Sequence, residues 1–122
     1  MIVYEVNIRV APGVLAAYRA WLAGHIDEML TLDGFVSASV FTDETDEAAA
    51  SEGDASERWP SLVVHYVLTD RAAFDRYLAT DAARMRADGV ARFGDRFAAT
   101  RRVLSLDAVQ GRAPFGWAKK TR

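Results

Sequence analysis

Alternating apolar and polar residues open the chain and predict the first of four strands. Residues 2–10 (IVYEVNIRV) are apolar at every even position, which is the pattern of a strand that buries one face. Stretches rich in β-branched and aromatic residues predict three further strands, over residues 35–42 (FVSASVFT), 61–68 (SLVVHYVL) and 98–107 (AATRRVLSLD). On the first strand, Glu5 and Asn7 share the face opposite to the wholly apolar one.

Between the first two strands the apolar residues follow helical spacing. They recur three and four positions apart from Val14 to Leu30, which predicts an amphipathic helix of about 18 residues. Pro12 suits the first turn of this helix, and Asp33-Gly34 suits its end.

A second helical stretch follows the third strand. Thr69 and Asp70 are residue types that cap helix N-termini. The side chains that this helix is expected to bury are Ala73, Phe74, Tyr77 and Leu78. Two cap-type residues then interrupt the apolar stripe, so we expect a break near Thr80, a helix end at Gly89 and a loop over residues 89–97.

The order of these elements, β-α-β-β-α-β, predicts a fold. Each helix joins two strands that must lie parallel, and right-handed crossovers then give a ferredoxin-like α+β fold. Its four-stranded antiparallel sheet has the spatial order 4-1-3-2, with both helices on one face. This places the first and third strands side by side in the centre.

The sheet face without helices carries an unusual mixture of side chains. The residues expected there are Val3, Glu5, Asn7, Arg9, Phe35, Phe41, Val63, His65 and Val67, with either Arg101 and Val103 or Arg102 and Leu104. Too many of these are apolar for a face exposed to water. We therefore expect a second copy of the chain to cover this face, which predicts a homodimer.

Composition supports one domain with two additions. A length of 122 residues, 51% of them hydrophobic, suits a single core, which we assign to residues 1–107. Residues 43–57 hold seven acidic residues and no basic one, which indicates a flexible acidic loop. Residues 108–122 hold four basic residues and no acidic one, and we expect a basic C-terminal tail.

Charge and residue usage exclude several classes of protein. The net charge of −2 argues against nucleic-acid binding. No apolar run approaches the ~20 residues of a membrane span, so no membrane partner is expected. Cysteine is absent, which excludes disulfides and thiolate metal sites, and by default we expect a cytoplasmic protein. No phosphate-loop or dinucleotide fingerprint occurs, so no cofactor is predicted.

Three segments carry a resemblance to a known family. They are MIVYEVNIRV, then WLAGHIDEML with DGFVSA after it, and RYLATDAARMRADGVARFGDRFAATRRVL. On them the chain resembles the DUF4286 family of uncharacterised proteins, within the dimeric α/β-barrel superfamily. The resemblance implies a homodimer with a cleft between sheet and helices. That superfamily includes cofactor-free monooxygenases, isomerases, haem-handling enzymes and ligand-binding domains, so the fold does not choose among functions.

The strongest candidate chemistry lies in the centre of the predicted sheet. His65, Glu5 and Asn7 face the same way on adjacent strands, and a carboxylate with an amide can orient an imidazole as a general base. Arg101 or Arg102 could then bind an anionic oxygen. The alternative is a buried polar network that orders the dimer interface.

Other candidates are weaker. Arg9 shares the face of Glu5, and Trp21 and Phe35 could stack on a planar aromatic ligand, although such aromatics more often belong to the core. His25 and Glu28 share a helix face, but two ligands without a third do not make a metal site, and no metal is predicted.

These residues leave three functional hypotheses open. The first is a protein that binds a small molecule in a sheet-lined cleft. The alternatives are a cofactor-independent monooxygenase or isomerase, and a non-catalytic structural or regulatory dimer. A cavity of about 300 Å³ or more beside His65 would favour a ligand site over a plain interface.

Overall fold

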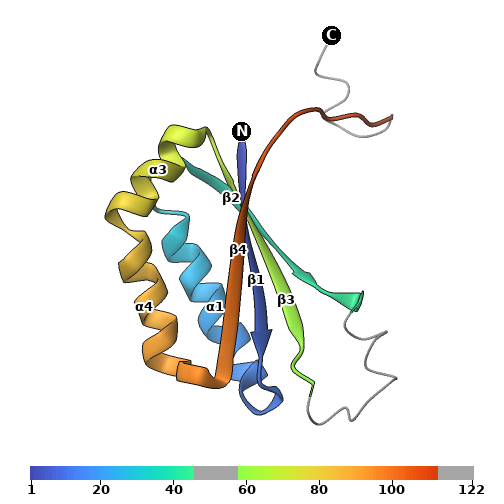
Figure 1. Cartoon of the computed structure of the whole chain (residues 1–122), viewed down its shortest axis with the longest axis vertical. Coiled ribbons are helices and arrows are strands. Elements are labelled where there is room, and N and C mark those ends of the chain that lie inside the picture. Colours follow the sequence, from blue (N-terminus) through green and yellow to red (C-terminus); the bar gives the residue numbers. More distant parts are fainter. Residues whose placement is uncertain (46–57, 113–122) are drawn as a thin grey trace.

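The computed structural model describes residues 1–45 and 58–112, which form one sheet covered on one face by helices (Figure 1). The elements are β1 (Ile2–Val10), α1 (Leu15–Met29), β2 (Phe35–Thr42), β3 (Ser61–Leu68), α3 (Arg71–Thr80), α4 (Ala82–Phe93) and β4 (Phe97–Ser105). Single 3₁₀ turns, Pro12–Val14 and Gly94–Arg96, precede α1 and β4. The predicted strands and the break in the second helical stretch are confirmed.

The sheet has the predicted topology. Its strands lie in the order β2-β3-β1-β4, and every neighbouring pair is antiparallel. All helices cover one face (Figure 1). The ferredoxin-like α+β fold class is therefore confirmed, and among the described residues no helix lies against the other broad face of the sheet.

The core lies between the sheet and the helices and is rich in aromatic rings. Tyr4, at the middle of this layer, has ring centroids 5.1 Å from Phe74, 5.6 Å from Tyr77 and 5.9 Å from Tyr66. Tilted and offset rings at these separations add to the free energy gained from burial. The other large, fully buried side chains are Met29, Leu62, Leu68, Val10 and Val64.

Phe35 does not lie where the alternation of β2 predicts. A bulge between Phe35 and Ser37 shifts the register, so that Phe35 pairs with Leu68 and Ser37 pairs with Val67. An extra residue at a bulge reverses the side-chain alternation that precedes it. Phe35 is therefore buried on the helix side, where its ring packs edge-on against Tyr77, and the prediction that it lines the open face is wrong.

The second helical stretch also differs from the prediction in part. The break falls at Asp81, and α4 runs past Gly89 to Phe93, so the expected loop over residues 89–97 is mostly helix. Leu78, expected to be buried, is 45% exposed. A glycine suits position 89 inside the helix because any larger residue would bring its Cβ to within 3.1 Å of the indole of Trp21. This glycine marks a close approach between α4 and α1 rather than a helix end.

The turn before β2 requires its glycine. Gly34 has a φ of 86°, and a Cβ at this position would clash with Ala73 of α3. Asp70 begins α3 by accepting a hydrogen bond from the Ala73 backbone N–H at 2.9 Å, which confirms the predicted N-cap. The two features fix the start of α3 against the start of β2.

The predicted acidic loop and basic tail fall mainly outside the described residues. Residues 46–57 and 113–122 are not described, so the expected flexibility of the loop stays a prediction. The domain limits assigned from composition also stay a prediction. Within the described part of the chain, no helix has the length and apolar character needed to cross a bilayer.

Candidate functional site

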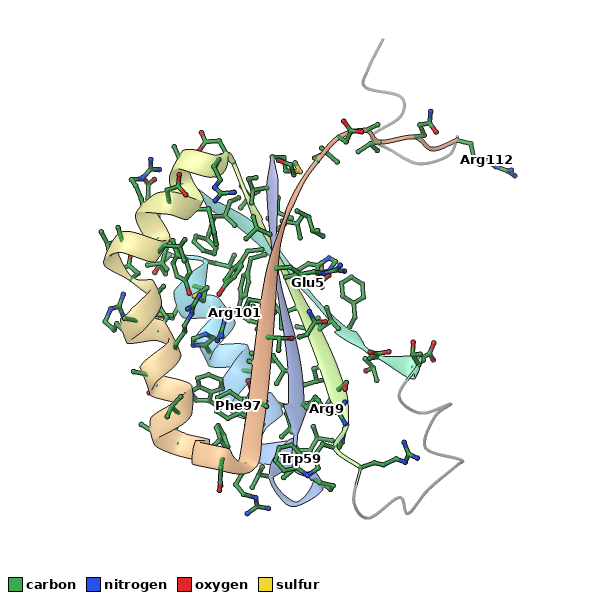
Figure 2. All side chains as sticks on the ribbon, viewed as in Figure 1. Glu5, Arg9, Trp59, Phe97, Arg101 and Arg112 are labelled. Atoms are coloured by element: carbon green, nitrogen blue, oxygen red, sulfur yellow. The ribbon has the colours of Figure 1, made fainter. Side chains whose placement is uncertain are left out.

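The register of the sheet divides the predicted site residues between its two faces. Glu5 pairs with His65 on one side and with Arg102 on the other, so these three side chains share the open face. Arg101 pairs with Val6 and faces the helices instead. Figure 2 shows Glu5 and Arg9 on one side of the sheet and Arg101 and Phe97 on the helix side. The side-chain chemistry therefore forms two separate sites.

The first site, called here the outer cluster, consists of Glu5, Asn7, His65 and Arg102. Glu5 Oε1 accepts hydrogen bonds from Arg102 Nε at 2.6 Å and from Asn7 Nδ2 at 2.9 Å. Glu5 Oε2 lies 2.9 Å from His65 Nε2 and 3.4 Å from Arg102 Nη2. The structure thus brings together all three predicted catalytic candidates and Arg102.

These contacts determine the charge of Glu5. Its side chain is only 7% exposed because the neighbouring side chains cover it. The hydrogen bond from Arg102, with those from Asn7 and His65, lowers the pKa of Glu5 to about 2 against the opposing effect of burial. An ionised carboxylate only accepts hydrogen bonds, so the Nε2 of His65 must carry the proton in this contact. Glu5 is therefore a saturated anion and a poor base.

The outer cluster lies in a wide, shallow depression of about 490 Å³ that is open to solvent. Phe41 forms one wall, with its ring centroid 5.1 Å from that of His65. Arg9 lies in an adjoining depression of about 250 Å³, which Asn7 also lines. The space beside His65 exceeds the ~300 Å³ typical of ligand sites, but those sites bury most of the ligand and this one does not.

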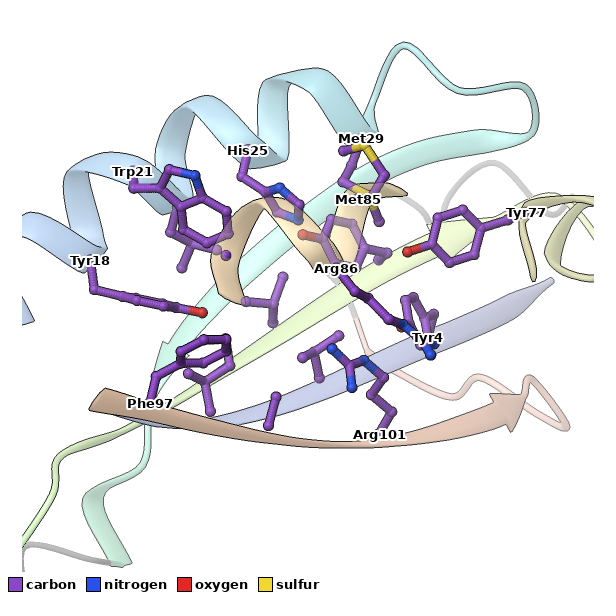
Figure 3. Close-up of a pocket in the computed structure, with 17 residues that line it drawn as sticks. Tyr4, Tyr18, Trp21, His25, Met29, Tyr77, Met85, Arg86, Phe97 and Arg101 are labelled. Carbon is purple, nitrogen blue, oxygen red and sulfur yellow. The ribbon is translucent and has the colours of Figure 1, made fainter. Parts of the chain in front are cut away.

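The second site, called here the inner cleft, lies between the sheet and helices α1 and α4 (Figure 3). Its aromatic lining consists of Tyr4, Tyr18, Trp21, Tyr66, Tyr77 and Phe97, and its basic or imidazole lining consists of His25, Arg86 and Arg101. The cleft has about 50 Å³ of space for solvent and about 480 Å³ when its open mouth is counted. It is the deeper of the two sites, and a narrow one.

Two polar atoms in the inner cleft are buried without a hydrogen-bond partner among the described residues. They are Nε of Arg86 and Nδ1 of His25. Arg86 is held at its other end, where Nη2 donates to the Tyr4 hydroxyl at 3.1 Å. Buried polar atoms normally have partners, so these two point to water or a ligand in the cleft.

His25 lines the inner cleft and packs against Trp21. Its ring stacks on the indole at a centroid distance of 4.5 Å, and the indole Nε1 donates to Asp88 at 2.9 Å. Burial lowers the pKa of His25 against the raising effect of Glu28 and Asp88. The imidazole is therefore neutral at pH 7 and can accept a proton or a hydrogen bond.

The tyrosines of the cleft are also uncharged. Burial raises the pKa of Tyr18 to about 12, and it raises the pKa of Tyr66 and Tyr77 further. Their hydroxyls are hydrogen-bond donors at neutral pH. The cleft thus combines apolar ring faces with neutral donors and two guanidinium groups.

The resemblance implies a cleft between sheet and helices, but the sequence does not assign Trp21, His25 and Arg101 to it as one site. Arg86 lies inside the helix predicted up to Gly89, but it is not among the predicted site residues. The signal was present, since Arg86 lies next to Met85 and three positions before Gly89, both buried. A charged residue on the buried stripe of a helix indicates a partner or a function. Among the described residues, no group of three His, Asp or Glu side chains could hold a metal.

Comparison with solved structures assigns the fold. The chain shares its ferredoxin-like fold with solved structures described as antibiotic biosynthesis monooxygenases. It belongs to the family described as domain of unknown function DUF4286, whose sequence profile matches residues 1–106. The resemblance drawn from the three sequence segments is thereby confirmed. A search of curated proteins finds no significant match.

Three solved structures illustrate the likeness. A Deinococcus radiodurans protein, provisionally assigned as an antibiotic biosynthesis monooxygenase, is 11% identical with a TM-score of 0.66, covering 91% of this chain and 97% of its own. SnoaB, a cofactor-independent oxygenase from Streptomyces nogalater, is 16% identical with a TM-score of 0.54 over 93% and 96%. A de novo designed protein is 14% identical with a TM-score of 0.55 over 87% and 98%. Since a designed protein shares it, the fold alone carries no activity.

Proposed function

We propose that this protein binds a small planar molecule in the inner cleft. The observation that carries the proposal is the pair of buried nitrogens, Arg86 Nε and His25 Nδ1, without partners among the described residues. They face a cleft walled by aromatic rings, which suit the faces of a planar ligand. The outer cluster offers no such unused groups on Glu5, because that carboxylate already accepts four contacts.

The size of the cleft limits the ligand. The ~50 Å³ of space for solvent holds a few water molecules, whereas a benzene-sized ligand needs about 150 Å³. The methionines Met29 and Met85 line the cleft and adapt their shape readily, and the exposed Arg101 can swing outward. We therefore propose a ligand of about one ring that displaces water and moves these side chains.

We assign the outer cluster to a homodimer interface. The open face exposes Phe41, 48% accessible, and Leu104, beside the half-buried Val63 and Val67. The charges of the outer cluster neutralise one another, so a second copy of the same face could cover them without meeting an unpaired charge. In this proposal Glu5, Asn7, His65 and Arg102 order the interface rather than catalyse a reaction. The cytoplasmic location and the lack of a nucleic-acid partner stay predictions.

The ligand proposal is tested by titrating ¹⁵N-labelled protein with benzamide, a neutral planar ring compound, in NMR spectra. Trp21 lines the cleft, so its indole N–H signal is expected to shift and to saturate at roughly millimolar benzamide, as suits so small a ligand. An indole signal that does not saturate would contradict the proposal.

A pair of glycine variants locates the binding. Gly89→Val would push a side chain into the cleft against Trp21, whereas Gly24→Val adds the same atoms to α1 where a Cβ meets nothing within 4 Å. We expect the first variant to lose the shift and the second to keep it. Equal shifts in both variants would place benzamide elsewhere.

Cofactor-independent oxidation is the second candidate, and His25 is the observation that favours it. A neutral imidazole with an unused nitrogen can take a proton from a phenol, and the resulting anion can reduce O₂. With hydroquinone the balanced products are benzoquinone and hydrogen peroxide. Oxygen uptake above the protein-free rate in the wild type, lost in His25→Gln, is expected; uptake at the protein-free rate would exclude this candidate for hydroquinone.

A further inference from the structure

We propose that the inner cleft selects a planar anion, an aromatic or enolic acid whose negatively charged oxygens lie between Arg86 and Arg101. This inference rests on the proposed ligand site and adds the chemical class of the ligand. It is carried by the distribution of charge around the cleft rather than by its shape.

The cleft has an excess of positive charge. Arg86 and Arg101 both line it, and none of the described residues that line it is acidic. The two guanidinium groups extend into the same end of the cleft (Figure 3). An unbalanced pair of cations in a partly desolvated site favours binding of an anion.

The two acidic side chains that act on His25 already have partners. Asp88 accepts the hydrogen bond from Trp21 and lies 4.0 Å from Arg92, and Glu28 forms an ion pair with Arg84 at 3.1 Å. Both carboxylates are more than half exposed, so water screens them. Neither one neutralises Arg86 or Arg101 by contact.

Arg86 is positioned to bind an anion. The Tyr4 hydroxyl accepts from its Nη2 at 3.1 Å and so holds the guanidinium in place, while the buried Nε has no partner among the described residues. A guanidinium edge with unused N–H groups matches the two oxygens of a carboxylate. Tyr4 therefore acts as a positioning residue for the proposed anion site.

Arg101 supplies the second cation from the sheet. No hydrogen bond or ion pair to this side chain is present among the described residues, whereas the adjacent Arg102 holds Glu5 through two hydrogen bonds. The two arginines are consecutive on β4 and point to opposite faces. Only the one that faces the cleft lacks an anionic partner.

The walls of the cleft define the rest of the ligand. Aromatic rings from β1, β3, α1 and α3 line the space next to the two arginines, so they favour a flat, apolar body attached to the acid group. The neutral tyrosine hydroxyls can donate to an anion and do not repel it. A planar acid could place its charged oxygens against the arginines and the tyrosine hydroxyls, and its flat body against the aromatic rings.

The experiment compares benzoate with benzamide, which have the same shape and differ in charge at pH 7. Titrations of the wild type at one salt concentration, followed through the indole signal of Trp21, are expected to give about tenfold tighter binding of benzoate. In Arg101→Gln, the affinity for benzoate is expected to fall to that for benzamide. The affinity for benzamide is expected to stay at its wild-type value. Arg101→Lys should restore part of the preference, because it returns the charge without the planar fork.

Arg102→Gln is the matched control, since it removes the same group from the next position on the opposite face. It is expected to leave the preference for benzoate intact. Equal affinity of the two compounds in the wild type, or the same loss in Arg101→Gln and Arg102→Gln, would overturn the anion inference while the ligand site itself stands. Absence of binding by both compounds would instead overturn the proposed function.

Discussion

The two arginines at the centre of β4 lie in opposite environments. Arg102 faces a carboxylate whose every oxygen is occupied, and Arg101 faces a cleft whose described lining contains no carboxylate. On the open face, the described side chains Asn7, His65 and Arg102 all contact the carboxylate of Glu5. On the helix face two buried nitrogens have no partner among the described residues. A satisfied polar cluster stabilises one arrangement of side chains, whereas an unsatisfied one is available for a ligand.

This difference reverses the expectation drawn from residue types alone. A histidine beside a carboxylate suggests a catalytic pair, and Glu5 and His65 do form that contact at 2.9 Å. Glu5 nevertheless has no oxygen left to accept a proton from a substrate, because Arg102 and Asn7 donate hydrogen bonds to its other oxygen. In the proposed homodimer, this geometry orders the surface that a second copy of the chain covers.

The largest expected effect concerns the interface role of the open face. Phe41→Asp adds a charge to the exposed apolar part of the proposed interface, and we expect homodimer affinity to fall at least about 100-fold, roughly 3 kcal/mol. Sedimentation should then give a 13.4 kDa monomer where the wild type gives a dimer.

The control for this substitution is Val90→Asp. Val90 is 58% exposed on α4, in the helix layer, and the variant adds the same charge away from the open face. It should remain dimeric. A wild type that is monomeric over a wide concentration range would contradict the proposed homodimer.

A smaller effect is expected from the carboxylate of the outer cluster. Glu5→Gln removes the anion that Arg102 and His65 contact, and we expect a loss of roughly 1–2 kcal/mol in the free energy of unfolding at pH 7. The shift in pKa alone would suggest more, but the side chains of Arg102 and His65 are themselves 66% and 33% exposed, so water screens the interaction. Denaturant unfolding measures this difference, with Glu28→Gln as a control on an exposed ion pair.

The same pair of proteins gives a pH test. The pKa of Glu5 in the folded state, about 2, lies below its ordinary value of 4.5, so the ionised group stabilises the fold above pH 4.5. This contribution is lost as the pH falls from 4.5 towards 2. The stability gap between wild type and Glu5→Gln should therefore narrow over that range, and a gap independent of pH would show that Glu5 acts by packing alone.

Much of the fold, and the membership of the outer cluster, follows from periodicity. Alternation on β1 and β3 assigns Glu5 and His65 to one face without any structure, because both strands carry apolar residues on the other face. The same argument fails at β2, where the bulge after Phe35 reverses the alternation. This bulge arises from the pairing of Phe35 with Leu68 of the next strand, so the sequence of β2 alone does not predict it.

The inner cleft was harder to predict for a different reason. Polar residues lie on both faces of β4, so alternation cannot decide between Arg101 and Arg102, and only the pairing of Arg102 with Glu5 does. Arg86 lies inside the helix that the sequence predicts, but its contact with the Tyr4 hydroxyl depends on how α4 packs on the sheet. Gly89 suggests a helix end in the sequence, and only its close approach to Trp21, some 70 residues earlier, explains a glycine inside α4.

The smallest expected effect separates the two arginines directly. Arg102→Gln removes the strongest partner of Glu5 and should lower the melting temperature measurably, whereas Arg101→Gln removes a cation without a partner among the described residues and should leave it unchanged or raise it. Melting of both variants beside the wild type, at low and at high salt, checks this expectation. Salt should reduce the loss in Arg102→Gln, since it screens an ion pair, and any gain in Arg101→Gln, since it screens repulsion from Arg86. An equal loss of melting temperature in both variants would mean that Arg101 stabilises the fold through contacts of its own. Arg101 and Arg102 would then not differ in the way proposed here for the helix face and the open face.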